Sequence, residues 1–241
     1  MTALPLPPRD YLPHLRTLTG AFAAEAPGDL GNPVPYCGDW TKRDLVTHLG
    51  NVHRWAAGIV RTGELSKQEF DVSPGGDLAS WYGESAAELL DELEAADPAD
   101  SCWVFGAAPK TKAFWFRRQV HETAVHLVDL FGARGRTAQL DPLIAADGVH
   151  EVLGTMLPRV ARWKHEVPLA APITLRTTDT GHAWTVVPGE PPELGEGEAV
   201  ATVAAPARDL LVLLWNRTDT QPEIAGDAAV AKGFLAARMT P

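Results

Sequence analysis

The chain has 241 residues, a formal net charge of −10 and 45% hydrophobic residues. This size and composition are typical of a globular protein with one large or two modest domains, and they exclude a disordered chain. The acidic excess repels phosphate groups, and no apolar run is long enough for a signal peptide or a membrane span. We therefore expect a cytoplasmic protein with neither nucleic acid nor a membrane as its partner.

Apolar residues recur at three- and four-residue steps through the first two thirds of the chain, which predicts helices. The second of these helices is expected to begin after Thr41, because Thr41 and Asp44 have the spacing of a capping box. A fifth helix is expected to begin at Asp141–Pro142. The four long helices, which predict a bundle, are expected at residues 15–22, 42–59, 78–93 and 112–131.

The pattern changes after the proline-bearing segment 167–172. Three β-rich runs follow at residues 173–180, 182–189 and 197–205, and helical spacing returns at 206–217 and 226–238. The acidic Gly- and Pro-rich run 188–198 is interpreted as a solvated loop. The predicted fold class is α+β and mainly α: a helical bundle over residues 1–167, followed by a small α/β domain over residues 168–241.

Side chains that can bind a metal are concentrated in two of the predicted helices. Glu122 and His126 lie four residues apart, so both side chains can point at one place. His48 falls on the inward apolar stripe of the second helix and is expected to point at the core, whereas His53 is displaced from that stripe. His121 should face elsewhere, as a surface or packing histidine.

Two interpretations of these residues stay open. Glu122 follows Arg118 by four residues, the spacing of an exposed ion pair, and a histidine on an apolar stripe is often a core residue. Alternatively, His48, Glu122 and His126 form a divalent metal site, with zinc the favoured ion, inside the bundle. Asp129 could then orient His126, or it could be a surface charge.

Four segments resemble the mycothiol-dependent maleylpyruvate isomerase family: WTKRDLVTHL, HETAVHLVDL, LLVLLWNR and IAGDAAVAKGFL. The resemblance covers nearly the whole chain. It implies a DinB-like, metal-binding four-helix domain and a small C-terminal domain of sterol-carrier-like character. It also implies that the metal ligands are His48, Glu122 and His126, the residues that helical spacing favours.

The resemblance further implies a catalytic role for Arg217, which could bind a substrate carboxylate, although a helix-end cation is the simpler interpretation. The implied activity is addition of the cosubstrate mycothiol, a low-molecular-weight thiol, to a small electrophile, as an isomerase or an S-transferase. A thiol-independent metal hydrolase and a non-enzymatic binding or regulatory bundle are the alternatives. The tryptophans are interpreted as core or interface anchors: Trp40, Trp55, Trp81, Trp103, Trp115, Trp163, Trp184 and Trp215.

Overall fold

The computed structural model describes residues 4–65, 76–218 and 220–241. Residue contacts divide the chain into two units, Leu6–Ala138 and a second that consists mainly of Gln139–Pro241. The boundary expected at residue 167 therefore falls inside the second unit. The reason is that helix α5 (Pro142–Glu151), expected to belong to the bundle, packs against helix α6 (Ala207–Leu214).

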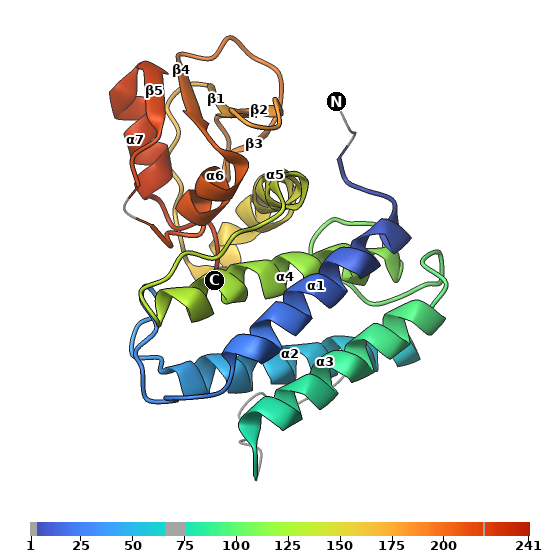
Figure 1. The fold of residues 1–241 in the computed structure, drawn as a ribbon. Coiled ribbons are helices and arrows are strands. Elements are labelled where there is room, and N and C mark those ends of the chain that lie inside the picture. The colour runs from blue at the N-terminus through green and yellow to red at the C-terminus, as the bar shows by residue number, and fades with distance from the viewer. Residues whose placement is uncertain (1–3, 66–75, 219) are drawn as a thin grey trace. The chain divides into compact units, whose positions relative to one another are not determined.

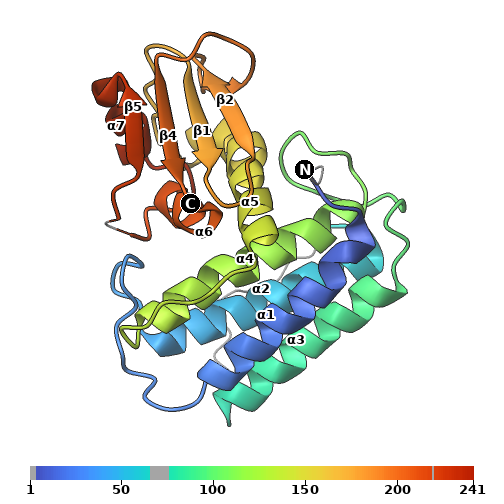
Figure 2. The same ribbon diagram turned by 45° about the horizontal axis from the view of Figure 1, so that its top comes forward.

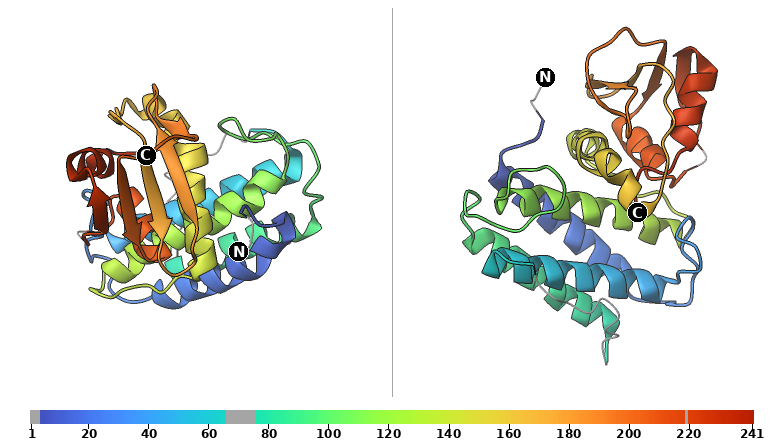
Figure 3. Two further views of the ribbon diagram at one scale, coloured as in Figure 1. Left: turned by 90° about the horizontal axis from the view of Figure 1, so that it is seen from above. Right: turned by 180° about the vertical axis from the view of Figure 1, so that it is seen from behind.

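The first unit is a four-helix bundle, as the sequence predicts. Helix α2 packs mainly on α3, and α1 packs mainly on α4, while contacts between α1 and α3 and between α2 and α4 close the bundle. Figure 1 shows the four helices side by side, and Figure 3 shows them from two further directions. A short 3-10 helix (Pro8–Asp10) precedes the bundle, whose helices are α1 (Tyr11–Glu25), α2 (Lys42–Thr62), α3 (Leu78–Ala95) and α4 (Ala113–Gly132).

The start of α2 lies one to two turns before His48, a residue of the site. The Thr41 side chain accepts a hydrogen bond from the Asp44 backbone N–H, and the Asp44 carboxylate accepts one from the Thr41 N–H at 2.8 Å. This is the predicted capping box. The helix ends at Gly63, which has the left-handed φ of 75° that favours glycine at this place.

The second unit is built on a five-stranded mixed sheet of order β3-β2-β1-β4-β5, in which only β1 and β4 pair in parallel. Figure 2 shows β2, β1, β4 and β5 in a row. A π-helical turn (Val152–Met156) and a 3-10 helix (Leu157–Trp163) follow α5, and α7 (Ala228–Ala236) follows the last strand. The strands are β1 (Ile173–Thr177), β2 (Ala183–Val187), β3 (Glu193–Leu194), β4 (Ala201–Ala205) and β5 (Glu223–Gly226).

The three predicted strands are confirmed as β1, β2 and β4, and two further strands escaped prediction. Strand β3 lies within the run interpreted as a solvated loop and has two residues, too few to show alternation. Strand β5 has no fully buried residue, so it lacks the apolar face that predicts a strand. Within the described ranges, no helix is both long enough and apolar enough to cross a membrane.

Candidate metal centre

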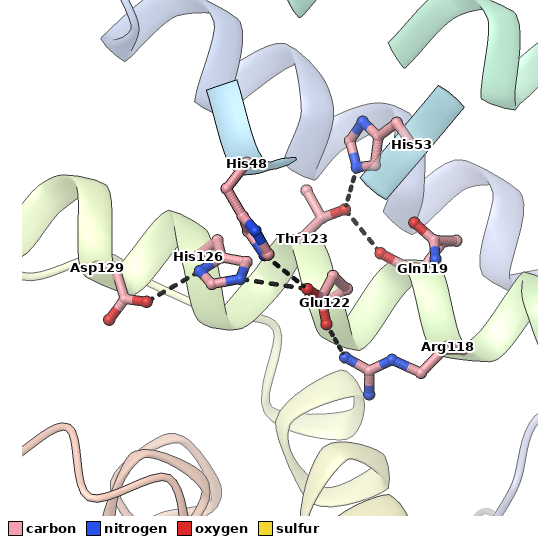
Figure 4. A network of polar contacts seen from close by, with 8 residues as sticks. All are labelled: His48, His53, Arg118, Gln119, Glu122, Thr123, His126 and Asp129. Carbon is pink, nitrogen blue, oxygen red and sulfur yellow. Dashed lines mark hydrogen bonds and ion pairs between the residues drawn. The ribbon is translucent and has the colours of Figure 1, made fainter. Parts of the chain in front are cut away.

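Three side chains that can bind a metal meet between α2 and α4. His48 comes from the second turn of α2, and Glu122 and His126 come from consecutive turns of α4. Figure 4 shows the His48 and His126 rings directed at the same carboxylate oxygen of Glu122. The structure thus brings together the three residues that helical spacing selects.

The spacing of the three ligand atoms suits a small cation. Glu122 Oε1 lies 3.6 Å from His48 Nε2 and 3.2 Å from His126 Nε2, and the three ligand atoms lie within 4.8 Å of one another. Ligands held tetrahedrally at about 2.0 to 2.2 Å from zinc are about 3.3 to 3.6 Å apart. Two imidazoles and one carboxylate form a donor set that leaves a fourth position open. The residues therefore fit a divalent metal ion.

Two buried residues contact the atoms of Glu122 and His126 that face away from the centre of the cluster. Asp129 Oδ2 lies 3.0 Å from His126 Nδ1, the ring nitrogen that faces away from Glu122. The guanidinium of Arg118 donates a hydrogen bond to Oε2 of Glu122, the oxygen that faces away from the histidines. Asp129 is therefore not a surface charge, and in the Arg118–Glu122 pair Arg118 is buried and Glu122 is only 17% exposed, where spacing alone suggested an exposed pair.

These contacts set the protonation of the site. Burial alone would raise the pKa of Glu122, but Arg118 and the two histidines outweigh it and hold this pKa well below its usual range. Burial alone would lower the pKa of His126, but the hydrogen bonds to Asp129 and Glu122 outweigh it and raise this pKa to about 9. At neutral pH Glu122 is ionised, and His126 carries a proton that a bound cation would replace.

His48 was expected to point at the core and His53 to lie away from the inward stripe, but the structure shows the reverse. The His48 side chain is 31% exposed at the edge of the bundle, whereas His53 is fully buried, with its Nε2 3.1 Å from Thr123 Oγ1. The His53 ring also lies 5.6 Å from the ring of Tyr82 on α3. Because α2 packs on both α3 and α4, it buries more than the single stripe that its periodicity indicates.

His121 is a packing residue and not a surface residue. Its side chain is buried, and its ring packs edge to face on Tyr11 of α1 at 6.3 Å. It therefore lies on the α1 side of α4, whereas Glu122 and His126 lie on the α2 side. This agrees with the expectation that His121 faces away from the other two.

Comparisons with known proteins agree with the fold and the motifs. A family model for the mycothiol maleylpyruvate isomerase N-terminal domain matches residues 12–131, and the model of the corresponding C-terminal domain matches residues 144–233. The chain belongs to the mycothiol maleylpyruvate isomerase family. The resemblance carried by the four sequence segments is thereby confirmed. No curated protein matches the sequence.

Two solved structures resemble the whole chain of this family member. They are crystal structures of the mycothiol-dependent maleylpyruvate isomerase and of a mutant with one histidine replaced by alanine, with TM-scores of 0.68 and 0.66. Each is 14% identical in sequence, and each alignment covers 93% of this chain and 96% of the other. The likeness shows that the two-part fold is shared.

Trp40 is the neighbour of the site that sequence reasoning missed. Its ring lies 4.9 Å from that of His48 and 6.5 Å from that of His126. The sequence analysis interpreted it as a core or interface anchor, but it is half-buried. Its position beside the capping residue Thr41, just before the helix that carries His48, was the signal that could have identified it.

Arg217 lies in the second unit of this family member, just after α6. Its backbone N–H donates to the carbonyl of Val212, and its guanidinium donates to the carbonyl of Trp215 at 3.1 Å. The preceding Asn216 has a positive φ of 53°, which turns the chain away from the helix axis. The guanidinium thus contacts the C-terminal end of α6, where a cation complements the helix dipole.

Proposed function

We propose that this protein is a metal-dependent enzyme that uses mycothiol to attack a small activated electrophile, as an isomerase or a thiol S-transferase. The observation that carries the proposal is the cluster of His48, Glu122 and His126 between α2 and α4. Family membership supports mycothiol as the thiol. The two crystal structures that resemble the chain are of a mycothiol-dependent maleylpyruvate isomerase, which supports the same reaction class.

We propose zinc as the ion, because two imidazoles and one carboxylate are a donor set that zinc enzymes use. A metal ion in such a site lowers the pKa of a thiol that binds at the open position, so that the reactive thiolate exists near neutral pH. His48, Glu122 and His126 would hold the ion. Asp129 orients His126, and Arg118 keeps Glu122 ionised and directs its other oxygen at the histidines.

The reaction itself needs no net proton transfer to the protein. The mycothiol sulfur forms a bond to one carbon of an activated cis double bond, and the π electrons move onto the conjugated acceptor group. The remaining single bond rotates, the carbon–sulfur bond breaks, and the trans double bond forms. If the carbon–sulfur bond persists and the adduct takes up a proton, the same attack gives an S-transfer product.

Arg217 is proposed to bind a carboxylate of the electrophile. A guanidinium can hold a carboxylate through two parallel hydrogen bonds, and the family resemblance of the segment LLVLLWNR supports this role for Arg217. This supports a small, carboxylate-bearing electrophile as the partner. We also propose a cytoplasmic location, because two cysteines in 241 residues cannot form a disulfide framework of the kind found in secreted proteins.

The test is metal analysis of the purified protein, followed by mass spectrometry of mycothiol mixed with candidate electrophiles. We expect about one zinc ion per chain and a trans isomer or mycothiol adduct that forms only with zinc-loaded protein. Chelator-treated protein and a reaction without thiol are the controls. A hydrolysis product that forms equally fast with and without thiol would contradict the proposal and indicate a hydrolase. Absence of both metal and product would indicate a binding or regulatory protein.

A further inference from the structure

The three proposed metal ligands differ in the contacts made by the side-chain atoms that face away from the other two ligands. Asp129 lies against His126, and Arg118 lies against Glu122. His48 directs its Nε2 at Glu122, and among the described residues no hydrogen-bond partner is found for its Nδ1. Histidines that bind metals commonly donate the second ring N–H to a carboxylate or a carbonyl, which fixes the ring. His48 needs another means of fixing its orientation.

The ring of Trp40 packs against the His48 imidazole. The Trp40 and His48 rings are 4.9 Å apart and tilted by 51°, within the range of favourable aromatic pairs. The same indole stacks on His126 at 6.5 Å with the planes 27° apart, and the two imidazoles are 5.0 Å apart, edge to face. Trp40 thus contacts both histidines of the cluster.

The backbone around Trp40 holds this ring in place. Its carbonyl accepts a hydrogen bond from the Val34 N–H at 2.8 Å, and its N–H donates to the Cys37 carbonyl. Pro33 and Thr41 form a bridge that closes the loop at its base. Because Thr41 is also the cap of α2, it joins the closed loop directly to the helix that carries His48.

We propose that Trp40 is a positioning residue of the metal centre, which holds the His48 ring in its ligand orientation by aromatic packing in place of a hydrogen bond. Rotation of His48 about its side-chain bonds would move the imidazole away from the indole and lose this packing. The inference rests on the proposed metal site but is independent of the thiol chemistry. It explains how a ligand that is 31% exposed keeps one orientation.

The experiment measures metal binding in the full chain with Trp40→Ala and Trp40→Phe. Trp103→Ala and Trp103→Phe are the matched controls, because Trp103 is also half-buried and packs on Trp55 and Trp115. Zinc affinity is measured by competition with a chromophoric chelator. Cobalt(II) absorption reports ligand geometry, a property that a purely structural role would not alter. Melts of the chelator-treated proteins establish that each variant folds.

We expect Trp40→Ala to weaken zinc binding by about 10- to 100-fold, the cost of losing an outer partner of a metal ligand, and to alter the cobalt spectrum. Trp40→Phe should restore most of the affinity and the wild-type spectrum, because an aromatic face remains. Both Trp103 variants should bind as the wild type does. If Trp40→Ala does not fold, Trp40→Leu replaces it, since leucine retains apolar volume without an aromatic face.

The outcomes separate the two proposals. Wild-type protein that binds neither zinc nor cobalt overturns the metal centre and, with it, the role of Trp40. If the wild-type protein binds both ions, and Trp40→Ala (or Trp40→Leu in its place) binds them as the wild type does or no more weakly than Trp103→Ala, only the role of Trp40 is overturned.

Discussion

Replacing His53 by glutamine should make the protein less sensitive to acid. His53 is fully buried beside Tyr82, and burial lowers the pKa of its imidazole to about 3. The folded protein therefore excludes a proton that the unfolded chain binds below its ordinary pKa of about 6.5. Stability from this residue is fully present above about pH 6.5, falls as the pH drops, and stops falling near pH 3.

The size of the effect follows from the two pKa values. Each pH unit between about 6.5 and 3 costs about 1.4 kcal/mol, so His53 removes about 2 kcal/mol of folding stability by about pH 5. In a chain of this length that corresponds to about 4 to 8 °C in the melting temperature. Glutamine carries no titrating proton but can still form a hydrogen bond to Thr123, so the variant should lack this part of the acid-induced loss.

The assay is thermal unfolding followed by far-ultraviolet circular dichroism, at about pH 7.5 and about pH 5, in the presence of a chelator. For each protein, the fall in melting temperature between the two pH values is measured. The fall of the variant is then subtracted from the fall of the wild type. His14→Gln, at a half-buried position on α1, is the control and should fall as the wild type does. An equal fall for the wild type and His53→Gln would refute the argument that His53 is buried in its neutral form.

The remaining predictions concern the proposed site. His126→Ala should weaken zinc binding more than 100-fold, since loss of a residue that only hydrogen-bonds a metal ligand costs about 10- to 100-fold. In calorimetric titrations, His121→Ala should change zinc affinity little. Equal losses for the two variants would contradict the placement of His121 and His126 on different faces of α4. Arg118→Met should destabilise the metal-free protein by less than the about 3 to 5 kcal/mol of a fully uncompensated buried charge, because protonated His126 still faces Glu122 after Arg118 is lost; zinc should restore part of this in melts, and unchanged stability would contradict the role of the pair. Arg217→Ala should cost about 0.3 to 1 kcal/mol of stability but impair turnover of carboxylate substrates far more. Arg217→Lys should also lose turnover, because lysine lacks the bidentate fork; full activity of the alanine variant would exclude a substrate role.

Local signals in the sequence predict most of the bundle and the three residues of the site. A four-residue step on a helix needs no tertiary information to place Glu122 and His126 on one face, and the capping box at Thr41 sets the register that turns His48 towards them. The helix start and the helical period therefore indicate which residues of α2 share a face, and packing on α3 and α4 decides which face meets α4.

The parts that escaped prediction depend on contacts between distant segments. Periodicity could not show that α2 has two buried faces, which is why His53 lies in the core and His48 at its edge. The helix at Pro142 carries the same signals whether it packs in the bundle or against α6, so its spacing cannot place a domain boundary. Trp40 lies in a non-helical loop that is closed by backbone hydrogen bonds such as Val34 N–H to the Trp40 carbonyl, and no periodic pattern reports such a loop.

The charges around the proposed metal centre favour a monoanion at its open position. Glu122 and Asp129 contribute two negative charges and Arg118 one positive charge, so a divalent cation would bring the cluster to a net charge of +1 when both histidines are neutral. A thiolate would then neutralise the cluster. Without Arg118 the same thiolate would leave a net negative charge among buried groups, which costs free energy. The buried Arg118 therefore matches the cluster to a monoanion, and a thiolate, the nucleophile of the proposed chemistry, is one.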